Sequence, residues 1–220
     1  DMAENHCEAI VVSLRIAWIG PWCEQSAIAA FGLEVVSEIE ARGHDVIVFR
    51  SETGDLLLQA PLPGKRSVRQ LTRNSTNELK WSFDHVIANI GDHFGFHGAI
   101  PDLLGKLSAT VIFHDGFIAN LAGVYAAQAF NSTESQTALV QLTHGPSVRV
   151  DGTDLWSTPL HVIAAERAML EWLARVASGC VTHSPIWADR LRSACAGPVE
   201  VIPLCYPDLE ISSPRPIGDV

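Results

Sequence analysis

The chain has 220 residues, 47% hydrophobic and 18% charged, which is the balance of a globular domain rather than a disordered tail. Its 25 acidic and 15 basic residues give a formal net charge of −10. Because Lys and Arg form no stripe, nucleic acid is not expected as a partner, and nothing supports a polybasic membrane anchor. No apolar run approaches the roughly 18 residues of a membrane span. The five cysteines form no C-x-x-C pair, so we expect reduced thiols in a cytoplasmic protein.

The first part of the chain alternates apolar runs with a helical repeat. Residues 14–19 and 45–50 are short apolar runs, which predict buried strands. Between them, residues 26–42 repeat apolar side chains at helical spacing and are followed by Gly43, as at the end of a helix. This order predicts a βαβ unit with parallel strands. Residues 51–80 show no sustained period, which is typical of loops or an edge strand.

The second part continues the alternation. Four further strands are expected, at residues 84–89, 110–113, 180–182 and 199–202, and helices at 97–107, 116–130, 158–179 and 185–194. The polar residues 131–157 favour a long loop. Six apolar strands alternating with helices predict a single α/β domain with a doubly wound, mainly parallel sheet that is covered on both faces.

Polar residues gather where the predicted strands end, which is where open parallel sheets bind ligands. These candidates are Gly20, Pro21, Trp22 and Ser26 after the first strand, Asp92, His93 and His97 after the third, His114 and Asp115 after the fourth, and His183 and Ser184 after the fifth. Imidazole beside carboxylate suits general-base chemistry, and it equally suits hydrogen bonding to a polyhydroxyl ligand. Two simpler readings stay open: Asp115 and Ser184 as helix caps, and Trp22 as a core residue rather than a platform for a sugar ring.

Several motifs are absent from the sequence. The first strand-to-helix turn lacks G-x-G-x-x-G, and there is no P-loop, no H-E-x-x-H and no G-x-S-x-G. Nicotinamide, flavin, zinc-protease and serine-hydrolase chemistry are therefore disfavoured. A metal site of His93, His97 and His114 is also disfavoured, because Gly95 and Gly98 oppose the helix that would align the first two.

Four short motifs follow one another along the chain. They are R-G-H-x-V-x-V-F at residues 42–49, I-G-x-H…H at 90–97, F-H-D at 113–115 and V-x-H-S…V-I-P at 181–203. With these motifs in this order, residues 14–205 resemble the N-terminal half of GT-B-fold glycosyltransferases, and are most similar to family 4. The resemblance implies a Rossmann-like domain that forms one half of a GT-B architecture.

The resemblance also implies a function. It implies the acceptor-binding domain of a retaining glycosyltransferase, which transfers a sugar from a nucleotide-sugar donor to a glycan or other hydroxyl acceptor in carbohydrate biosynthesis. Residues 1–13 would be an N-terminal extension, and residues 206–220 would begin a linker to a donor-binding domain. No metal or cofactor is implied beyond the nucleotide sugar, which the second domain would mainly bind, so residues 1–220 alone are expected to be inactive.

The implied site residues come from the strand ends. His114 and Asp115 would be catalytic, for acceptor orientation or proton handling. Substrate binding would fall to Gly20, Pro21, Trp22, Ser26, Asp92, His93, His97, His183 and Ser184.

The first loop departs from the family pattern. Trp22, Cys23 and Glu24 stand where a glycine pair is common, and a carboxylate there repels a diphosphate. This favours the alternative of a non-catalytic carbohydrate- or protein-binding module derived from a glycosyltransferase domain. A third, more distant reading is a nucleotide-binding regulatory domain or a reductase, which the missing glycine fingerprint disfavours.

Overall fold

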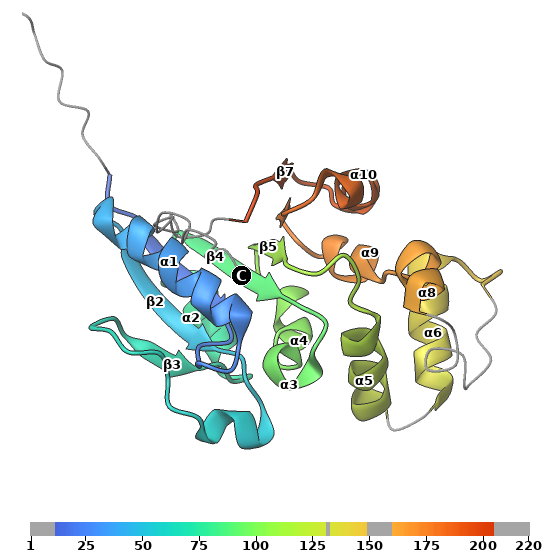
Figure 1. Cartoon of the computed structure of the whole chain (residues 1–220), viewed down its shortest axis with the longest axis horizontal. Coiled ribbons are helices and arrows are strands. Elements are labelled where there is room, and N and C mark those ends of the chain that lie inside the picture. The colour runs from blue at the N-terminus through green and yellow to red at the C-terminus, as the bar shows by residue number, and fades with distance from the viewer. Residues whose placement is uncertain (1–11, 131–132, 149–159, 205–220) are drawn as a thin grey trace, which may run out of the picture.

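The computed structural model describes residues 12–130, 133–148 and 160–204 (Figure 1). The predicted linker at residues 206–220, most of the predicted N-terminal extension and the predicted helix start at Thr158 lie outside these residues.

The described residues form one parallel sheet of seven strands in the order β3-β2-β1-β4-β5-β6-β7. The order 3-2-1-4-5-6 is that of the doubly wound Rossmann-like sheet, here with one more strand at its end. The strands are β1 (Arg15–Gly20), β2 (Asp45–Arg50), β3 (Val68–Gln70), β4 (His85–Ile90), β5 (Ala109–Phe113), β6 (Gly179–Thr182) and β7 (Val199–Val201). The predicted fold class is confirmed.

Helices connect the strands and cover both faces of the sheet (Figure 1). They are α1 (Ala27–Ala41), the short 3₁₀ helix η1 (Gly54–Leu58), α2 (Ser75–Trp81), α3 (Phe94–His97), α4 (Pro101–Leu104), α5 (Ala119–Phe130), α6 (Thr133–His144), α8 (Leu160–Glu166), α9 (Leu170–Ala174) and α10 (Pro185–Ala194). None of these helices has the length and apolar character that crossing a membrane requires.

The alternation of side chains along the strands divides the core into two layers. On one face, alternate strand residues such as Ile19 and Ile90 pack against residues of α2, α4, α5, α9 and α10. On the other face, Trp18 and Val48 pack against Trp22 and against Val36 of α1. The helices thus close both faces and leave the carboxyl edge of the strands as the place where loops and helix starts meet.

Helix α1 begins and ends as its sequence suggests. Ser26 is its N-cap, and the Ser26 hydroxyl accepts a hydrogen bond from the backbone N–H of Ala29. Gly43 follows the C-cap with a φ of +89°, a left-handed conformation that glycine adopts without strain. The predicted βαβ unit is confirmed, because β1 and β2 pair in parallel with Arg15 opposite Asp45.

Four expectations about the elements need correction. The described part of residues 131–157 is not all loop, because Thr133–His144 forms α6. Of the predicted helix 97–107, only Pro101–Leu104 forms a separate helix, α4, since His97 is the last residue of α3. The predicted helix 158–179 is interrupted between α8 and α9, where Met169 has a φ of +62°. The sheet has seven strands rather than six, because Val68–Gln70 pairs in parallel with β2 as an edge strand.

Candidate functional site

An open cleft of about 480 Å³ lies at the carboxyl ends of β4 and β5. We call it the edge cleft, and it is lined by Asp92, His93, Phe94, Gly95, Asp115, Asn120 and Val124. Asp92 and His93 follow β4, Asp115 follows β5, and Asn120 is in the first turn of α5. Three of the site residues expected from the sequence, Asp92, His93 and Asp115, are therefore brought together here.

Asp92 ties the edge cleft to the start of α5. Its Oδ1 accepts hydrogen bonds from the backbone N–H groups of Asn120 (2.8 Å) and Leu121 (3.2 Å), and its Oδ2 accepts one from the Asn120 amide. Its own backbone N–H donates to Oδ2 of Asp115 at 2.7 Å. Burial raises the pKa of Asp92 to about 6, and the nearby Asp115 charge adds to this, although the hydrogen bonds from α5 oppose it. Asp92 therefore changes charge close to neutral pH.

A chain of hydrogen bonds runs beside this cleft across the ends of five strands. The Asn89 amide nitrogen donates to the carbonyl oxygen of Ile19 at 3.0 Å, and Oδ1 of Asn89 lies 3.0 Å from Nε2 of His114. Nδ1 of His114 lies 3.2 Å from Nε2 of His183, whose Nδ1 lies 2.7 Å from the carbonyl oxygen of Ile202. We call this chain the edge relay. It links β1, β4, β5 and β6 to the residue that follows β7.

The partners of the edge relay fix its number of protons. Oδ1 of Asn89 and the Ile202 carbonyl are acceptors, so Nε2 of His114 and Nδ1 of His183 must each carry a proton. The contact between the two rings needs a third proton, because two bare ring nitrogens would repel each other. With every bond of the relay made, the histidine pair therefore carries one positive charge.

The environment of His114 disfavours a positive charge on its ring. Burial, together with the neighbouring His183 and His97, lowers the pKa of His114 to about 3. Phe31 of α1 packs edge-on against both rings, with centroid distances of 4.9 Å to His114 and 5.2 Å to His183. Both ring nitrogens of His114 are thus engaged within the protein.

His97 lies beneath the edge cleft rather than in its lining, which corrects the expectation that it lines the rim. Its side chain is buried, its Nδ1 contacts the carbonyl oxygen of Asn89 at 3.1 Å, and burial lowers its pKa to about 3. Gly91 separates it from Asp115. A Cβ on Gly91 would lie 2.9 Å from Nε2 of His97 and 3.0 Å from Oδ2 of Asp115, so only glycine fits between them.

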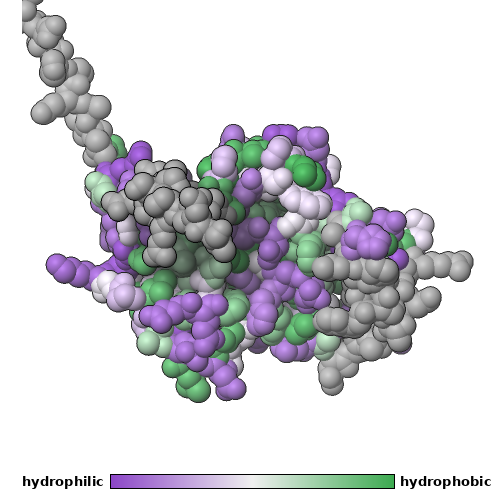
Figure 2. Space-filling view, viewed as in Figure 1, coloured by the Kyte–Doolittle hydropathy of each residue, from purple (hydrophilic) through white to green (hydrophobic). Residues whose placement is uncertain are grey.

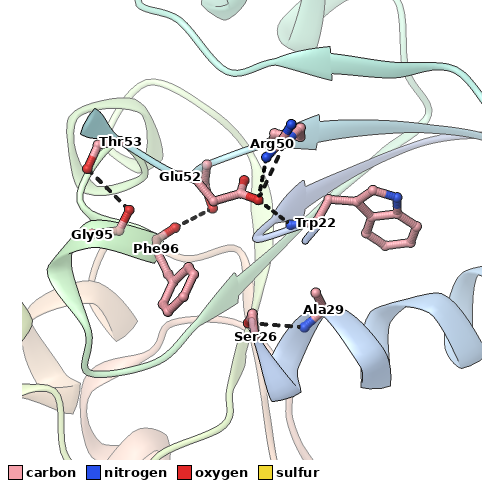
Figure 3. Close-up of polar contacts among 9 residues, drawn as sticks. Trp22, Ser26, Ala29, Arg50, Glu52, Thr53, Gly95 and Phe96 are labelled. Carbon is pink, nitrogen blue, oxygen red and sulfur yellow. Dashed lines mark hydrogen bonds and ion pairs between the residues drawn. The ribbon is translucent and has the colours of Figure 1, made fainter. Parts of the chain in front are cut away.

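A buried ion pair holds the loop that follows β1 (Figure 3). Oε1 of Glu52 accepts the backbone N–H of Trp22 at 2.8 Å, and Nη2 of Arg50 donates to the same oxygen at 3.1 Å. The Glu52 side chain is fully buried and that of Arg50 is 10% exposed. The neighbouring Ser51 hydroxyl donates to the carbonyl oxygen of Phe96 at 2.7 Å, which joins the segment after β2 to α3.

The expectation that Trp22 offers its ring to a sugar is wrong. The side chain is fully buried, packs with Trp18 and Val36, and lies under the guanidinium of Arg66 at 5.4 Å from the ring centroid. Gly20 and Pro21 are also buried, and Ser26 and Ser184 cap α1 and α10 with their hydroxyls. The loop after β1 is therefore built mainly for packing.

Three polar residues of this edge were not expected from the sequence: Asn89, Asn120 and Glu52. Asn89 and Glu52 are nearly or fully buried, at 1% and 2% exposure. A polar residue inside an apolar strand, as in the run Val-Ile-Ala-Asn-Ile at residues 86–90, is the signal that could have revealed Asn89. Asn120 carries no such signal, because asparagine near a helix start is ordinary. In the described residues, no group of three or more His, Cys, Asp or Glu side chains is arranged to hold a metal ion.

Comparisons with known proteins add little to this picture. No protein-family model matches the chain, and no curated protein matches it. Among solved structures, an alpha-glucosyltransferase in complex with UDP and a 13-mer DNA with a central A:G mismatch is 14% identical, with a TM-score of 0.38 over 79% of this chain. An alpha-glucosyltransferase in complex with UDP and a 13-mer DNA containing a HMU base is 13% identical, with a TM-score of 0.31 over 89% of this chain. The chain spans 38% and 66% of the lengths of these two structures, and likeness at this level carries no argument about activity.

Proposed function

We propose that the chain is the acceptor-binding half of a retaining glycosyltransferase, which transfers a sugar from a nucleotide-sugar donor to a hydroxyl group of a glycan or similar acceptor. The observation that carries this proposal is the edge cleft, in which Asp92, His93, Asp115 and Asn120 gather around one open space of about 480 Å³. Carboxylate, imidazole and amide groups are partners for sugar hydroxyls, and the volume is that of a small-molecule site. As the family resemblance implies, a second domain would hold most of the donor, and no metal or further cofactor takes part.

Asp115 is the group that we propose to act on the acceptor. Its side chain is exposed, its Oδ2 is held by the backbone N–H of Asp92, and its Oδ1 has no hydrogen-bond partner among the described residues. In the transfer, the acceptor oxygen forms a bond to the anomeric carbon while the bond to the leaving diphosphate breaks. The hydroxyl proton leaves with Oδ1 of Asp115 or with the leaving phosphate.

His114 would act differently from Asp115. Both of its ring nitrogens are engaged by Asn89 and His183, and burial lowers its pKa to about 3, so it is a poor proton acceptor. We assign it the role of a positioning residue that fixes the end of β5, and therefore Asp115.

The same observation favours a second candidate, a non-catalytic carbohydrate-binding module. In that case the engaged His114 and the buried loop after β1 would be structural, and the edge cleft would hold a sugar without acting on it.

Sugar transfer by the protein expressed with its full reading frame distinguishes the two candidates. Asp115→Asn should lower kcat by a factor of about 100 or more, as expected for loss of a proton-accepting or orienting group. Asp45→Asn is the matched control, because Asp45 is exposed at the start of β2, on the opposite edge of the sheet. Equal turnover of the two variants, with unchanged circular dichroism, would contradict the catalytic proposal. Sugar binding without any transfer would establish the binding module.

A further inference from the structure

A second cleft, of about 580 Å³, shares Phe94 with the edge cleft. We call it the outer cleft. Its walls come from the segment after β3, from α3 and α4 and from α5, and its polar lining residues are Thr72, Arg73, Asp102, Tyr125 and Gln128. No site residue expected from the sequence lies in it.

The two clefts follow one another along α5. Asn120 and Val124 line the edge cleft, whereas Tyr125 and Gln128 line the outer cleft. Residues four positions apart share one face of a helix, so Asn120, Val124 and Gln128 form a single stripe. At 1.5 Å per residue this stripe is about 12 Å long, which is longer than one hexose ring. The two clefts therefore lie end to end along α5, and Phe94 lines both of them.

The Asp102 carboxylate of the outer cleft is held by two donors before any ligand binds. The Tyr125 hydroxyl donates to Oδ1 of Asp102 at 2.6 Å, and Nη2 of Arg73 donates to Oδ2 of Asp102 at 3.2 Å. Burial raises the pKa of Tyr125 to about 12, and its hydrogen bond to Asp102 adds to this, so the hydroxyl stays protonated. Gln128 is exposed and adds an amide. The surface over α3, α4 and α5 mixes hydrophilic and hydrophobic side chains, as Figure 2 shows.

The charges of the two clefts restrict the chemistry of their ligand. Asp92 and Asp115 line the edge cleft and Asp102 lines the outer cleft, whereas Arg73 is the only Lys or Arg among the described lining residues. The guanidinium of Arg73 is already paired with Asp102. A phosphate or carboxylate on the ligand would meet net repulsion. Hydroxyl groups, in contrast, can donate to the carboxylates and to the Tyr125 oxygen, whose own proton is held by Asp102, and can accept from the two side-chain amides.

We propose that the edge cleft and the outer cleft form one groove for an uncharged oligosaccharide acceptor of at least two sugar units. The sugar that receives the transferred unit occupies the edge cleft beside Asp115, and the next sugar passes Phe94 into the outer cleft. This inference rests on the proposed function and narrows its acceptor class from any hydroxyl compound to a neutral glycan chain.

Titration of the isotope-labelled chain, followed through its backbone amide signals, tests the inference without any need for turnover. The probes are glucose and galactose, the disaccharides cellobiose, maltose and lactose, and glucose 6-phosphate as a charged sugar. We expect at least one disaccharide to bind roughly ten-fold more tightly than its monosaccharides. Its signal changes should run along α5 from Asn120 to residue 129, whereas glucose 6-phosphate should bind no better than glucose.

Two variants locate the second sugar. Gln128→Ala and Tyr125→Phe should each remove most of the disaccharide advantage and leave monosaccharide binding unchanged. Gln59→Ala is the matched control, because Gln59 is exposed after η1 and lines neither cleft.

The possible failures are distinct. Monosaccharide binding at the edge cleft with no gain from a second unit would overturn the groove and leave the proposed function standing. Tighter binding of glucose 6-phosphate would overturn the uncharged class of ligand. Binding of none of these sugars would contradict both the groove and the proposed function.

Discussion

The buried pair of Arg50 and Glu52 gives the sharpest stability prediction. Glu52→Gln keeps one oxygen that can accept the backbone N–H of Trp22 but removes the charge that faces Arg50. Arg50 is only 10% exposed in its side chain, so its charge would be left without compensation. Breaking a buried pair in this way costs about 3 kcal/mol or somewhat more. For a chain of this size, that loss corresponds to a fall in Tm of roughly 6–12 °C.

The assay is urea and thermal unfolding followed by circular dichroism, with two comparison variants. Asp45→Asn removes one partner of the pair between Arg15 and Asp45, whose side chains are 44% and 62% exposed, so it should cost less than about 1 kcal/mol. The double variant Arg50→Met with Glu52→Gln should recover most of the loss, because no unpaired charge remains. If Glu52→Gln costs no more than Asp45→Asn, or if the double variant is as unstable as the single one, the reasoning about this pair is wrong.

Three further predictions concern the carboxyl edge. Burial raises the pKa of Asp92 to about 6, so protonation of Asp92 stabilises the folded chain most below about pH 4. This contribution to the free energy of unfolding is lost as the pH rises through 6. Urea unfolding measured from pH 4 to 7 should show this loss of stability in the wild type and not in Asp92→Asn. Gly91→Ala would place a Cβ 2.6 Å from a carbon of Ile28 and should lower the free energy of unfolding by about 1–3 kcal/mol. Gly105→Ala has open space around it and should leave the stability unchanged or raise it slightly. The opposite order of stabilities in urea unfolding would refute the packing argument. Ring nitrogen signals of His114 and His183 should report three protons on the pair whenever the contact between the two rings is present, and two neutral rings that remain in contact would contradict the proton count.

The pattern of the sequence was sufficient for the fold class and for six of the seven strands. Strands with all-apolar runs, such as β1 and β2, and the strongly periodic α1 are elements in which local preference and burial agree. Helix α6 was missed because its sequence, Thr-Glu-Ser-Gln-Thr-Ala-Leu-Val-Gln-Leu-Thr-His, is mostly polar. Its helical form depends on packing against α5, through residues such as Val140, rather than on its own pattern. The break at Met169 also depends on tertiary packing, since methionine is a good helix former.

The candidate site was predictable only in part, for reasons that lie in side-chain direction. Asp92, His93 and Asp115 follow adjacent strands, so the strand order alone brings them together. His97 and Trp22 are equally close to strand ends in the sequence, but their side chains turn into the core. Neither periodicity nor spacing distinguishes a side chain that faces a cleft from one that packs beneath it. The outer cleft was invisible for a similar reason, because segments distant in sequence, after β3, in α4 and in α5, supply its walls.

The most direct test of the proposed site is a crystal structure of the chain with the sugar that it binds most tightly. We predict a sugar hydroxyl within hydrogen-bonding distance of Asp115 in the edge cleft, with the rest of the glycan running past Phe94 along α5. A sugar bound away from the carboxyl edge of β4 and β5, with the edge cleft filled only by water, would contradict it.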